Sequence, residues 1–392
     1  MGSGMGTPRG TVRFLHTSDW QLGMTRHYLA GEAQARFTGD RVETIRRIGE
    51  LARRTGAEFV VVAGDVFEHH NLGRQDVVRA LEAMGSIPVP VYLLPGNHDP
   101  LGPGTLWESS DFVDRRQRNV ILLDEVGPWP VRDGVEIVAA PWRTKHPDSD
   151  PVEPALQGLA ADGTVRIVVG HGMLAELQPD RAALETVHRP PLDAALSAGT
   201  VHYVALGDRH IQWPADDDPE HVHGAIHYSG AHETTGFREP DRGRVLEVVL
   251  EGGRPTVTSH EVGRWLHRVV EADLDGAADL DALEAELAAL EPKERIILKT
   301  RFAGTLSLAE ASRLDALVEA EGQVFAALDA WERHTDLAVV PDEAELGELA
   351  AGGYVLEAAQ ELSGFAQGSG PEADTARDAL RLLYRFLGGE PR

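Results

Sequence analysis

The sequence predicts an α/β fold in which a core of two sheets, with helices outside, is followed by a small α/β unit and a helical C-terminal tail. Short apolar runs rich in β-branched residues recur through the first half of the chain, with helix-like segments between the early ones. Between residues 224 and 262, strand-like runs follow one another without helices. Beyond residue 265 a strand-and-helix pattern returns, and after residue 341 helices interrupted by glycine follow.

Five strand-like runs, each ending in a polar cluster, define the first domain, which we place at residues 10–264. They read VRFLHTSD, EFVVVAGDVFE, VPVYLLPGNHD, VRIVVGHGM and VHYVALGDRH. Helices are expected at 40–55 and 74–85, so the strands between them should be buried on both faces. The later runs AIHYSG, RVLEVVL and TVTSHEV are expected to form a meander that closes a second sheet. Polar residues at the carboxyl ends of such strands lie where α/β folds place their sites.

A second domain is expected at residues 265–340. HRVVEADL and RIILKTRFAG are typical of strands, LDALEAELAAL of a helix, and 307–333 of a long amphipathic helix, with DLAVVP as a further strand. Residues 341–392 are expected to form a helical tail with a flexible break at FAQGSGPEA. The apolar face of its last helix would contain Leu380, Leu383, Phe386 and Leu387. Docking on a partner and packing on its own domain are equally compatible with that face.

Composition limits the class of protein. A chain of 392 residues suggests two or three domains, and the hydrophobic content of 42% is enough for a packed core. No cysteine is present, which excludes disulfides and thiolate metal sites. Without a run long enough to span a bilayer or a secretion signal, we expect a cytoplasmic protein that makes no membrane contact. The net charge of −26 argues against a broad basic surface, so any DNA contact must be local or assisted by metal ions.

The polar clusters at the five strand ends offer only oxygen and imidazole ligands. They contain Asp19, Gln21, Asp65, Asn97, His98, Asp99, His171, Asp208 and His210. Two divalent ions about 4 Å apart need several protein ligands and one bridging group, and a carboxylate suits the bridge. Asp65 is the best candidate, because Gly64 lets the backbone turn sharply before it. One Asp after a strand is more often a cap or turn former, but five clusters in order predict a metal site.

The tripeptide Asn97-His98-Asp99 offers two kinds of chemistry. Asn97 can ligate a metal through its carbonyl oxygen. His98 can stay off the metal and act as a general acid toward a leaving alkoxide. Asp99 is expected to hold the tautomer of His98 by accepting a hydrogen bond from a ring nitrogen.

For several other polar residues, the sequence favours a structural role over a functional one. His69 and His70 are typical of a solvated loop. The alternating spacing of His221, His223 and His227 is typical of residues on one face of a strand. The cluster Arg115-Arg116-Gln117-Arg118 is more typical of a solvated helix end than of a phosphate contact. For Lys293, Arg295, Lys299 and Arg301, a phosphate-binding face and the wet face of a sheet are equally compatible with the alternation.

On these motifs the chain resembles the calcineurin-like metallophosphoesterases from residue 12 to about 262. GDVFE with GNHD is typical of that superfamily. HTSDWQLG with YSG is more closely similar to the SbcD nuclease subunits of SbcCD-type DNA repair complexes. The resemblance implies an αββα metallophosphoesterase sandwich, with residues 265–340 as a capping domain and the tail as a segment that docks on an SbcC-type ATPase.

By position in these motifs, the resemblance also implies the site residues. Asp19, Gln21, Asp65 and His210 would hold the first metal, and Asp65, Asn97, His171 and Asp208 the second, with His98 as the acid. The implied activity is Mn²⁺-dependent exonuclease and endonuclease hydrolysis of DNA phosphodiesters, with Mg²⁺ as the other candidate ion. The implied partners are DNA and an SbcC-type ATPase, and a homodimer is a further expectation.

Two positions depart from the family pattern, in which both are histidines. Gln21 and Asp208 replace an imidazole by an oxygen ligand, which favours Mn²⁺ or Mg²⁺ over Zn²⁺. Two alternative functions therefore stay open at this point. The chain could be a phosphodiesterase acting on nucleotides or small phosphate esters, or a non-catalytic scaffold that binds DNA or the ATPase through a degenerate site. The intact Asn97, His98 and Asp99 argue against the scaffold.

Overall fold

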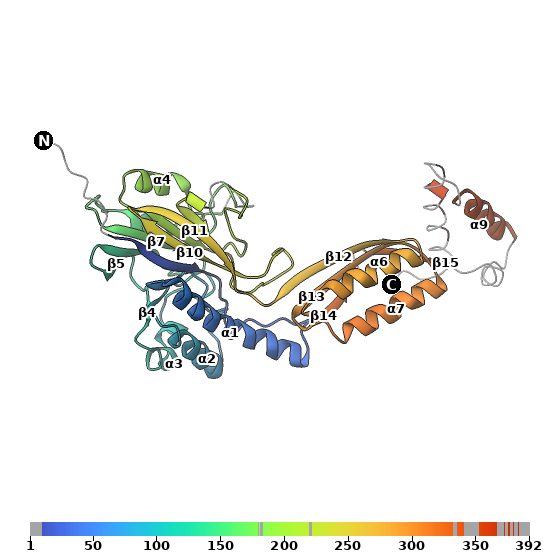
Figure 1. The fold of residues 1–392 in the computed structure, drawn as a ribbon, viewed down its shortest axis with the longest axis horizontal. Coiled ribbons are helices and arrows are strands. Elements are labelled where there is room, and N and C mark those ends of the chain that lie inside the picture. The colour runs from blue at the N-terminus through green and yellow to red at the C-terminus, as the bar shows by residue number, and fades with distance from the viewer. Residues whose placement is uncertain are drawn as a thin grey trace. The chain divides into compact units, whose positions relative to one another are not determined.

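The computed structural model describes residues 10–178, 180, 183–218, 222–331, 335–340 and 353–366, and the single positions 372, 375, 376, 379 and 383. The chain divides into two compact units, Met1–Leu266 and His267–Arg392, whose elements are drawn in Figure 1. Each unit is described by itself. Among the described residues, no helix is long and apolar enough to cross a membrane.

The first unit contains a six-stranded and a five-stranded sheet. The first sheet has the order β11-β10-β1-β2-β3-β4 and comprises β1 (Val12–Thr17), β2 (Phe59–Val62), β3 (Val91–Leu93), β4 (Val120–Leu122), β10 (Arg244–Glu251) and β11 (Arg254–Glu261). The second has the order β5-β6-β7-β8-β9 and comprises β5 (Gly127–Arg132), β6 (Val135–Ala139), β7 (Val165–His171), β8 (Tyr203–Gly207) and β9 (Ile226–Tyr228). Within each sheet the central strands are parallel.

Helices cover the outer faces of both sheets, which confirms the predicted αββα arrangement. The helices are α1 (Gly31–Thr55), α2 (Arg74–Gly85), α3 (Ser110–Val113) and α4 (Arg189–Ser197), with the short 3₁₀ turns η1 (Leu106–Glu108) and η2 (Glu153–Leu156). In Figure 1, α1 and α2 lie on one side of the first unit and α4 on the other. Phe14 packs between the sheets while its neighbour Leu15 packs under α1, because successive side chains of a strand face opposite ways.

The meander predicted over residues 224–262 is wrong in its sheet assignment. β9 does join the second sheet, where it pairs in parallel with β8. β10 and β11 instead belong to the first sheet, in which β10 runs antiparallel to β1 with Val12 opposite Leu250. The chain therefore crosses from one sheet to the other between Tyr228 and Arg244. An apolar strand pattern shows which face is buried but not which neighbour it pairs with.

The topology brings five strand ends to one edge of the sandwich. β1, β2 and β3 end side by side, since Thr17 pairs with Val62 and Val62 with Leu93. β7 and β8 end side by side in the other sheet, where His171 pairs with Gly207. Isolated bridges from Ser18 to Ala231 and from Leu22 to Phe67 continue the pairing beyond the strands. The loops at this edge hold the polar clusters of the sequence.

Up to residue 340, the described residues of the second unit form a four-stranded sheet with the helices α6 and α7. Its elements are β12 (Leu266–Leu274), α6 (Ala277–Ala289), η3 (Lys293–Arg295), β13 (Ile296–Ser307), α7 (Leu308–Gly322), β14 (Ala327–Ala330) and β15 (Asp336–Val340). The helix predicted over 307–333 is too long. Ser307 begins it with a capping box to Glu310, but it ends at Gly322 and the chain re-enters the sheet as β14, parallel to β13.

The C-terminal part of the chain contains α9 (Gly353–Ala366) among the described residues. Two large aromatic side chains of this helix, Tyr354 and Phe365, are 80% and 57% exposed. Of the predicted apolar face, Leu380, Phe386 and Leu387 lie outside the described residues, as does most of the predicted break. The domain boundary at residue 340 and the function of the tail stay predictions.

Candidate metal centre

Four of the predicted ligands adopt a backbone conformation that side chains rarely adopt. Among the described non-glycine residues, positive φ angles occur at Asp19 (51°), Gln21 (41°), Asp65 (52°) and Asp208 (92°). Such a conformation costs on the order of 1–3 kcal/mol per residue and persists only where the surrounding structure imposes it. The strain is therefore concentrated just beyond the ends of β1, β2 and β8.

Backbone hydrogen bonds between the loops impose this conformation. Asp19 N–H donates to Gly64 O at 3.1 Å, and Gln21 N–H donates to Asp65 O at 2.8 Å. The loop after β1 is thereby joined to the loop after β2. Gly64, with a φ of 93°, passes close to the ring of His171, and a Cβ at this position would lie 2.0 Å from His171 Nδ1. The glycine is required both by its φ and by this close approach.

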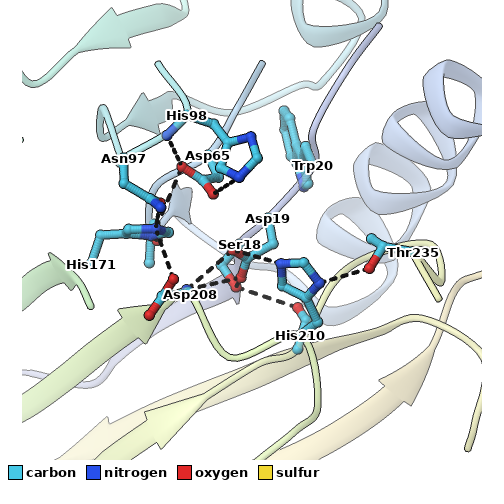
Figure 2. A network of polar contacts seen from close by, with 12 residues as sticks. Ser18, Asp19, Trp20, Asp65, Asn97, His98, His171, Asp208, His210 and Thr235 are labelled. Carbon is cyan, nitrogen blue, oxygen red and sulfur yellow. Dashed lines mark hydrogen bonds and ion pairs between the residues drawn. The ribbon is translucent and has the colours of Figure 1, made fainter. Parts of the chain in front are cut away.

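The ligands predicted for the second metal converge on the ring of His171 (Figure 2). Its Nε2 lies 3.4 Å from Asp65 Oδ1, 2.9 Å from Asn97 Oδ1 and 3.9 Å from Asp208 Oδ1. The other ring nitrogen, Nδ1, is 2.9 Å from Ala63 O and must donate to it, because a carbonyl oxygen only accepts. In the neutral ring, Nε2 therefore presents a lone pair to the oxygen atoms around it.

This arrangement fits a cation. The amide oxygen of Asn97 faces only hydrogen-bond acceptors. In the opposite orientation of the amide group, its nitrogen would donate to His171 Nε2 and to both Asp65 oxygens. A cation bound among these atoms would accept the lone pairs of the Asn97 amide oxygen, His171 Nε2 and the Asp65 oxygens, with the amide oxygen facing the centre. Burial acts to lower the pKa of His171, but the charges of Asp65, Asp19 and Asp208 raise it well above its usual value. The carboxylates thus favour a positive charge at their centre.

The ligands predicted for the first metal gather around Asp19. His210 Nε2 lies 3.7 Å from Asp19 Oδ1, and Asp208 N–H donates to both Asp19 oxygens at 3.1 and 3.2 Å. Asp19, Asp65 and His171 each offer a ligand atom, and these atoms lie within 4.8 Å of one another. Burial raises the pKa of Asp19, while the neighbouring charges of His210 and His171 act to lower it, and a cation bound here would favour the ionised carboxylate further.

Gln21 is a predicted ligand whose side chain makes no hydrogen bond among the described residues. Its side chain is 2% exposed, and its Oε1 is buried without a hydrogen-bond partner in the described structure. A buried amide oxygen without a partner costs on the order of 1–3 kcal/mol. A metal ion would supply the missing partner, and this orphaned atom is the observation that supports Gln21 as a ligand.

A comparison with protein families identifies the chain. The model of the calcineurin-like phosphoesterases matches residues 12–212, just over half of the sequence. The chain belongs to this family. It is therefore a metal-dependent phosphoester hydrolase, and the oxygen and imidazole cluster at the sheet edge is its candidate metal centre.

Other comparisons add little to the family assignment. Over 64% of its length the phosphoesterase is similar to TT1561 of Thermus thermophilus, with 12% identity, a TM-score of 0.38 and coverage of 100% of that chain. Over 64% it is also similar to the purple acid phosphatase PPD1 from yellow lupin (Lupinus luteus) seeds, with 11% identity, a TM-score of 0.38 and coverage of 52% of that chain. Similarity this low says nothing about substrate. No curated protein matches the chain.

In the phosphoesterase, His98 lies beside the centre without belonging to it. Its Nδ1 is 3.0 Å from Glu68 O, its Nε2 is 3.9 Å from Asp65 Oδ2, and its side chain is 38% exposed. The bond to the Glu68 carbonyl means that Nδ1 carries a hydrogen, so Nε2 faces the centre. Its backbone N–H donates to Asp65 Oδ1 at 2.9 Å, which fixes the loop against the predicted bridging carboxylate.

The role predicted for Asp99 needs correction. Its carboxylate accepts hydrogen bonds from Phe67 N–H at 2.9 Å and Gly96 N–H at 2.7 Å, and the ring of His98 is held by Glu68 O instead. Burial and the charge of Asp65 raise the pKa of Asp99 to about 7. Asp99 therefore fixes the loops after β2 and β3, and the residue next to His98 in sequence is not its hydrogen-bond acceptor.

Three residues of the site were not identified from the sequence. Ser18 Oγ donates to Asp19 Oδ2 at 2.5 Å, and the ring of His210 contacts Thr235 and Glu239 through Nδ1. Burial lowers the pKa of His210, but the hydrogen bond to Glu239 and the charge of Asp19 raise it to about 9. The only signal for Thr235 and Glu239 was their place in the HETTGFRE run that follows YSG.

Histidines for which the sequence favoured a structural role, and the basic residues of the second unit, make contacts outside the centre. His227 is buried and stacks on Tyr203, His70 Nδ1 accepts from Leu106 N–H at 3.4 Å, and His221 lies outside the described residues. The four basic residues of the second unit contact groups within it. Lys293 pairs with Glu321, Arg295 with Glu294 and Arg301 with Glu271, and Lys299 lies over the ring of Trp331. Lys293 and Arg295 lie in η3 and not on β13, so the predicted alternation along one strand is wrong for them, and these contacts within the unit argue against a phosphate-binding face.

Proposed function

We propose that this phosphoesterase is a DNA nuclease that hydrolyses phosphodiester bonds in DNA repair, with Mn²⁺ as its preferred ion. The observation that carries the proposal is the contact between the two motifs that narrow the resemblance to the repair nucleases. Ser18 of HTSDWQLG and Ser229 of YSG lie with their Oγ atoms 3.1 Å apart, and Ser18 bridges to Ala231. Two segments about 210 residues apart in sequence thus form one unit under Asp19.

The donor set supports the choice of ion. The residues that would hold two metals are Asp19, Gln21, Asp65 and His210 for the first, and Asp65, Asn97, His171 and Asp208 for the second. Oxygen donors outnumber imidazoles in both sets, which favours Mn²⁺ or Mg²⁺ over Zn²⁺. When bound, such a pair polarises the phosphate and activates the attacking water.

The chain's own residues supply the acid. Because Nδ1 of His98 donates to Glu68 O, a second proton on the ring must sit on Nε2, which faces Asp65. The carboxylate oxygen Oδ2 of Asp65 lies 3.9 Å from that nitrogen. Nε2–H can then donate to the oxygen that leaves the phosphorus, and the fixed orientation of the ring keeps the proton directed at the centre.

The proposed partners are DNA and an SbcC-type ATPase, the latter bound through the C-terminal tail. Tyr354 and Phe365 of α9 are exposed aromatic residues, and aromatic side chains are enriched at protein interfaces. Their exposure supports a docking role for the helix. A homodimer remains part of the proposal through the family resemblance alone.

A cleavage assay tests the proposed activity. The full chain is stripped of metal and supplied with Mn²⁺, Mg²⁺ or Zn²⁺ in turn, with labelled single-stranded and double-stranded DNA as substrates. Bis(p-nitrophenyl) phosphate is included as a small diester. We expect DNA cleavage with Mn²⁺ strongest, and a loss of at least about 10²-fold in kcat for His98→Ala, the usual contribution of a general acid. His69→Ala, an exposed neighbouring histidine, is the matched control.

The outcomes separate the three functions considered above. Cleavage of the small diester without cleavage of DNA would replace the nuclease by a phosphodiesterase of small esters. No turnover of any substrate, with two metal ions bound, would favour the non-catalytic scaffold. Equal loss of activity in His98→Ala and His69→Ala would remove His98 from its role as the acid.

A further inference from the structure

Arg209 is a cation that follows a predicted ligand directly in sequence and has no hydrogen bond or ion pair in the described structure. It lies between Asp208 and His210, directly after β8. In the described structure its Nε is buried and has no hydrogen-bond partner, and the side chain makes no ion pair. Its two terminal nitrogens, which also lack partners, are not among the buried atoms and are therefore open to solvent.

Neighbouring arginines, by contrast, are engaged. Arg26 and Arg41 donate to backbone carbonyls of the loop that contains Thr235, and Arg189 pairs with Glu176 and Asp193. A partly buried guanidinium with an unsatisfied nitrogen costs free energy. In a chain with a net charge of −26, carboxylates are abundant. An arginine that finds none of them is therefore free to bind an anion from outside.

Tyr228, whose hydroxyl the charge of Arg209 affects, packs against the loop that follows His171. The hydroxyl of Tyr228 accepts from Leu174 N–H and donates to Gly172 O, both at 2.8 Å, in the loop that follows His171. Burial raises the pKa of Tyr228 well above its usual value, and the charge of Arg209 acts to lower it. The charges of Arg209 and Asp208 both act on this hydroxyl, and the guanidinium makes no ion pair with the ligand carboxylates in the described structure.

We propose that Arg209 binds a second phosphate of the substrate, one that flanks the phosphate being hydrolysed. The proposal rests on the proposed action on DNA, a substrate with regularly spaced phosphates. The phosphate that reacts would lie at the ligand carboxylates, with which Arg209 makes no ion pair. A phosphate one nucleotide away would reach beyond the ligand set. Guanidinium groups suit that contact, because their planar fork matches phosphate oxygens.

The charges of Asp208 and Arg209 also support binding of a substrate phosphate by Arg209. Asp208 places a negative charge at the edge of a site that must accept an anionic substrate. Arg209, the next residue, adds a positive charge that can attract the anionic substrate, and it makes no ion pair with Asp208. A second contact to the substrate would add binding energy far from the reacting bond, which lowers KM without a matching change in kcat.

The test compares substrates that differ by one phosphate. Two p-nitrophenyl esters are used, of thymidine 5′-phosphate and of thymidine 3′-phosphate, each with and without a phosphate on the other hydroxyl. The wild-type chain should prefer one of the doubly phosphorylated esters by about tenfold in KM, the size of one charged hydrogen bond. Arg209→Ala should lose that preference, Arg209→Lys should retain part of it, and Arg189→Ala, a nearby paired arginine, should keep it.

Two further readouts exclude a purely structural role. The Mn²⁺ affinity of Arg209→Ala, measured by calorimetry, should equal that of the wild type, and its melting temperature should fall by no more than the lost packing of its partly buried stem, since the side chain makes no hydrogen bond or ion pair in the described structure. Kinetic constants for bis(p-nitrophenyl) phosphate, which has a single phosphate, should also be unchanged.

The proposal is overturned if the wild type shows no preference for either doubly phosphorylated ester, or if Arg209→Ala keeps the preference. Equal losses on esters with one and two phosphates would place Arg209 at the reacting phosphate and also overturn it. A wild type that prefers a doubly phosphorylated ester but does not cleave DNA would reject the proposed nuclease and leave the binding of a second phosphate standing.

Discussion

His210 is held between Asp19 and Glu239. Its Nε2 lies 3.7 Å from Asp19 Oδ1, and its Nδ1 lies 2.7 Å from Thr235 Oγ1 and 3.3 Å from Glu239 Oε1. Glu239 also accepts from Thr235 N–H at 2.7 Å and is 6% exposed, so its carboxylate is fixed in place. A carboxylate behind a ligating imidazole places the ring hydrogen on Nδ1 and leaves Nε2 free for the metal.

Glu239 should therefore control the affinity of the first metal site. We expect Glu239→Ala to weaken one of two Mn²⁺ sites by about 10–100-fold, the usual effect of removing such a carboxylate, and Glu239→Gln to weaken it less. Calorimetric titration with Mn²⁺ measures both sites. Glu153→Ala, an exposed glutamate of η2, is the control. Unchanged affinity at both sites in Glu239→Ala would show that Thr235 alone is sufficient to orient the ring.

Gln21 should limit how tightly the first metal is held. Gln21→His would place an imidazole at a strained position that histidine tolerates better than most residues, since its φ is 41°. We expect Mn²⁺ affinity at the first site to rise on the order of tenfold, equivalent to about 1.4 kcal/mol, and Zn²⁺ to gain more than Mn²⁺. Equilibrium dialysis with each ion gives the result. Weaker binding of both ions would mean that the side chain of Gln21 does not reach the metal.

The sequence predicted which polar residues at the strand ends lie together better than it predicted their hydrogen-bond partners, and the reason is geometric. Asp19, Asp65 and His171 each follow an apolar run, and parallel strands end at one edge, so their meeting could be expected. Glu239 lies 29 residues after His210, in a loop beyond β9 for which no periodic pattern exists. Adjacency in sequence was misleading for Asp99, because backbone N–H groups of the loops compete for its carboxylate more effectively than the ring of His98.

The same limit applies to the fold. Apolar patterns located β10 and β11 but could not decide between two sheets, since both offer an apolar face and a free edge. The helical periodicity seen beyond Gly322 belongs partly to β14, whose Ala327–Ala330 segment pairs with β13. Short strands with few residues carry too little pattern to be separated from the end of a helix.

Gly64 should be essential to the geometry of the centre. A methyl group there would lie 2.0 Å from His171 Nδ1, and the φ of 93° is unfavourable for alanine. Gly252 has a φ of 59° with open space around it, so Gly252→Ala measures the conformational cost alone, about 1–2 kcal/mol. We expect Gly64→Ala to lower the melting temperature by clearly more than Gly252→Ala does, and to lose Mn²⁺ binding. Equal effects of the two substitutions would show that the ring of His171 can move aside at little cost.

Stability should fall in mild acid because of His16, a buried residue that is not a ligand. Its Nδ1 is 3.2 Å from Tyr203 Oη and its Nε2 is 3.1 Å from Leu206 O. Burial, together with the charge of His227, lowers its pKa to about 3. The folded chain thus keeps this ring neutral, while the unfolded chain protonates it near the ordinary pKa of about 6.5.

The loss of stability in acid arises because the unfolded state takes up a proton on His16 more readily than the folded state does. Below pH 6.5 the unfolded state binds more protons, so the contribution of His16 is present above that pH and is lost as the pH falls toward 3. Between pH 6.5 and 5 the loss is about 2 kcal/mol, or about 4–8 °C in melting temperature for a unit of this size. His16→Gln keeps groups that can bond to Tyr203 and Leu206 but cannot titrate. Its melting temperature, measured without metal at pH 7 and pH 5, should fall less between the two than that of the wild type. Identical slopes would mean that other buried groups, such as His232, cause the loss of stability.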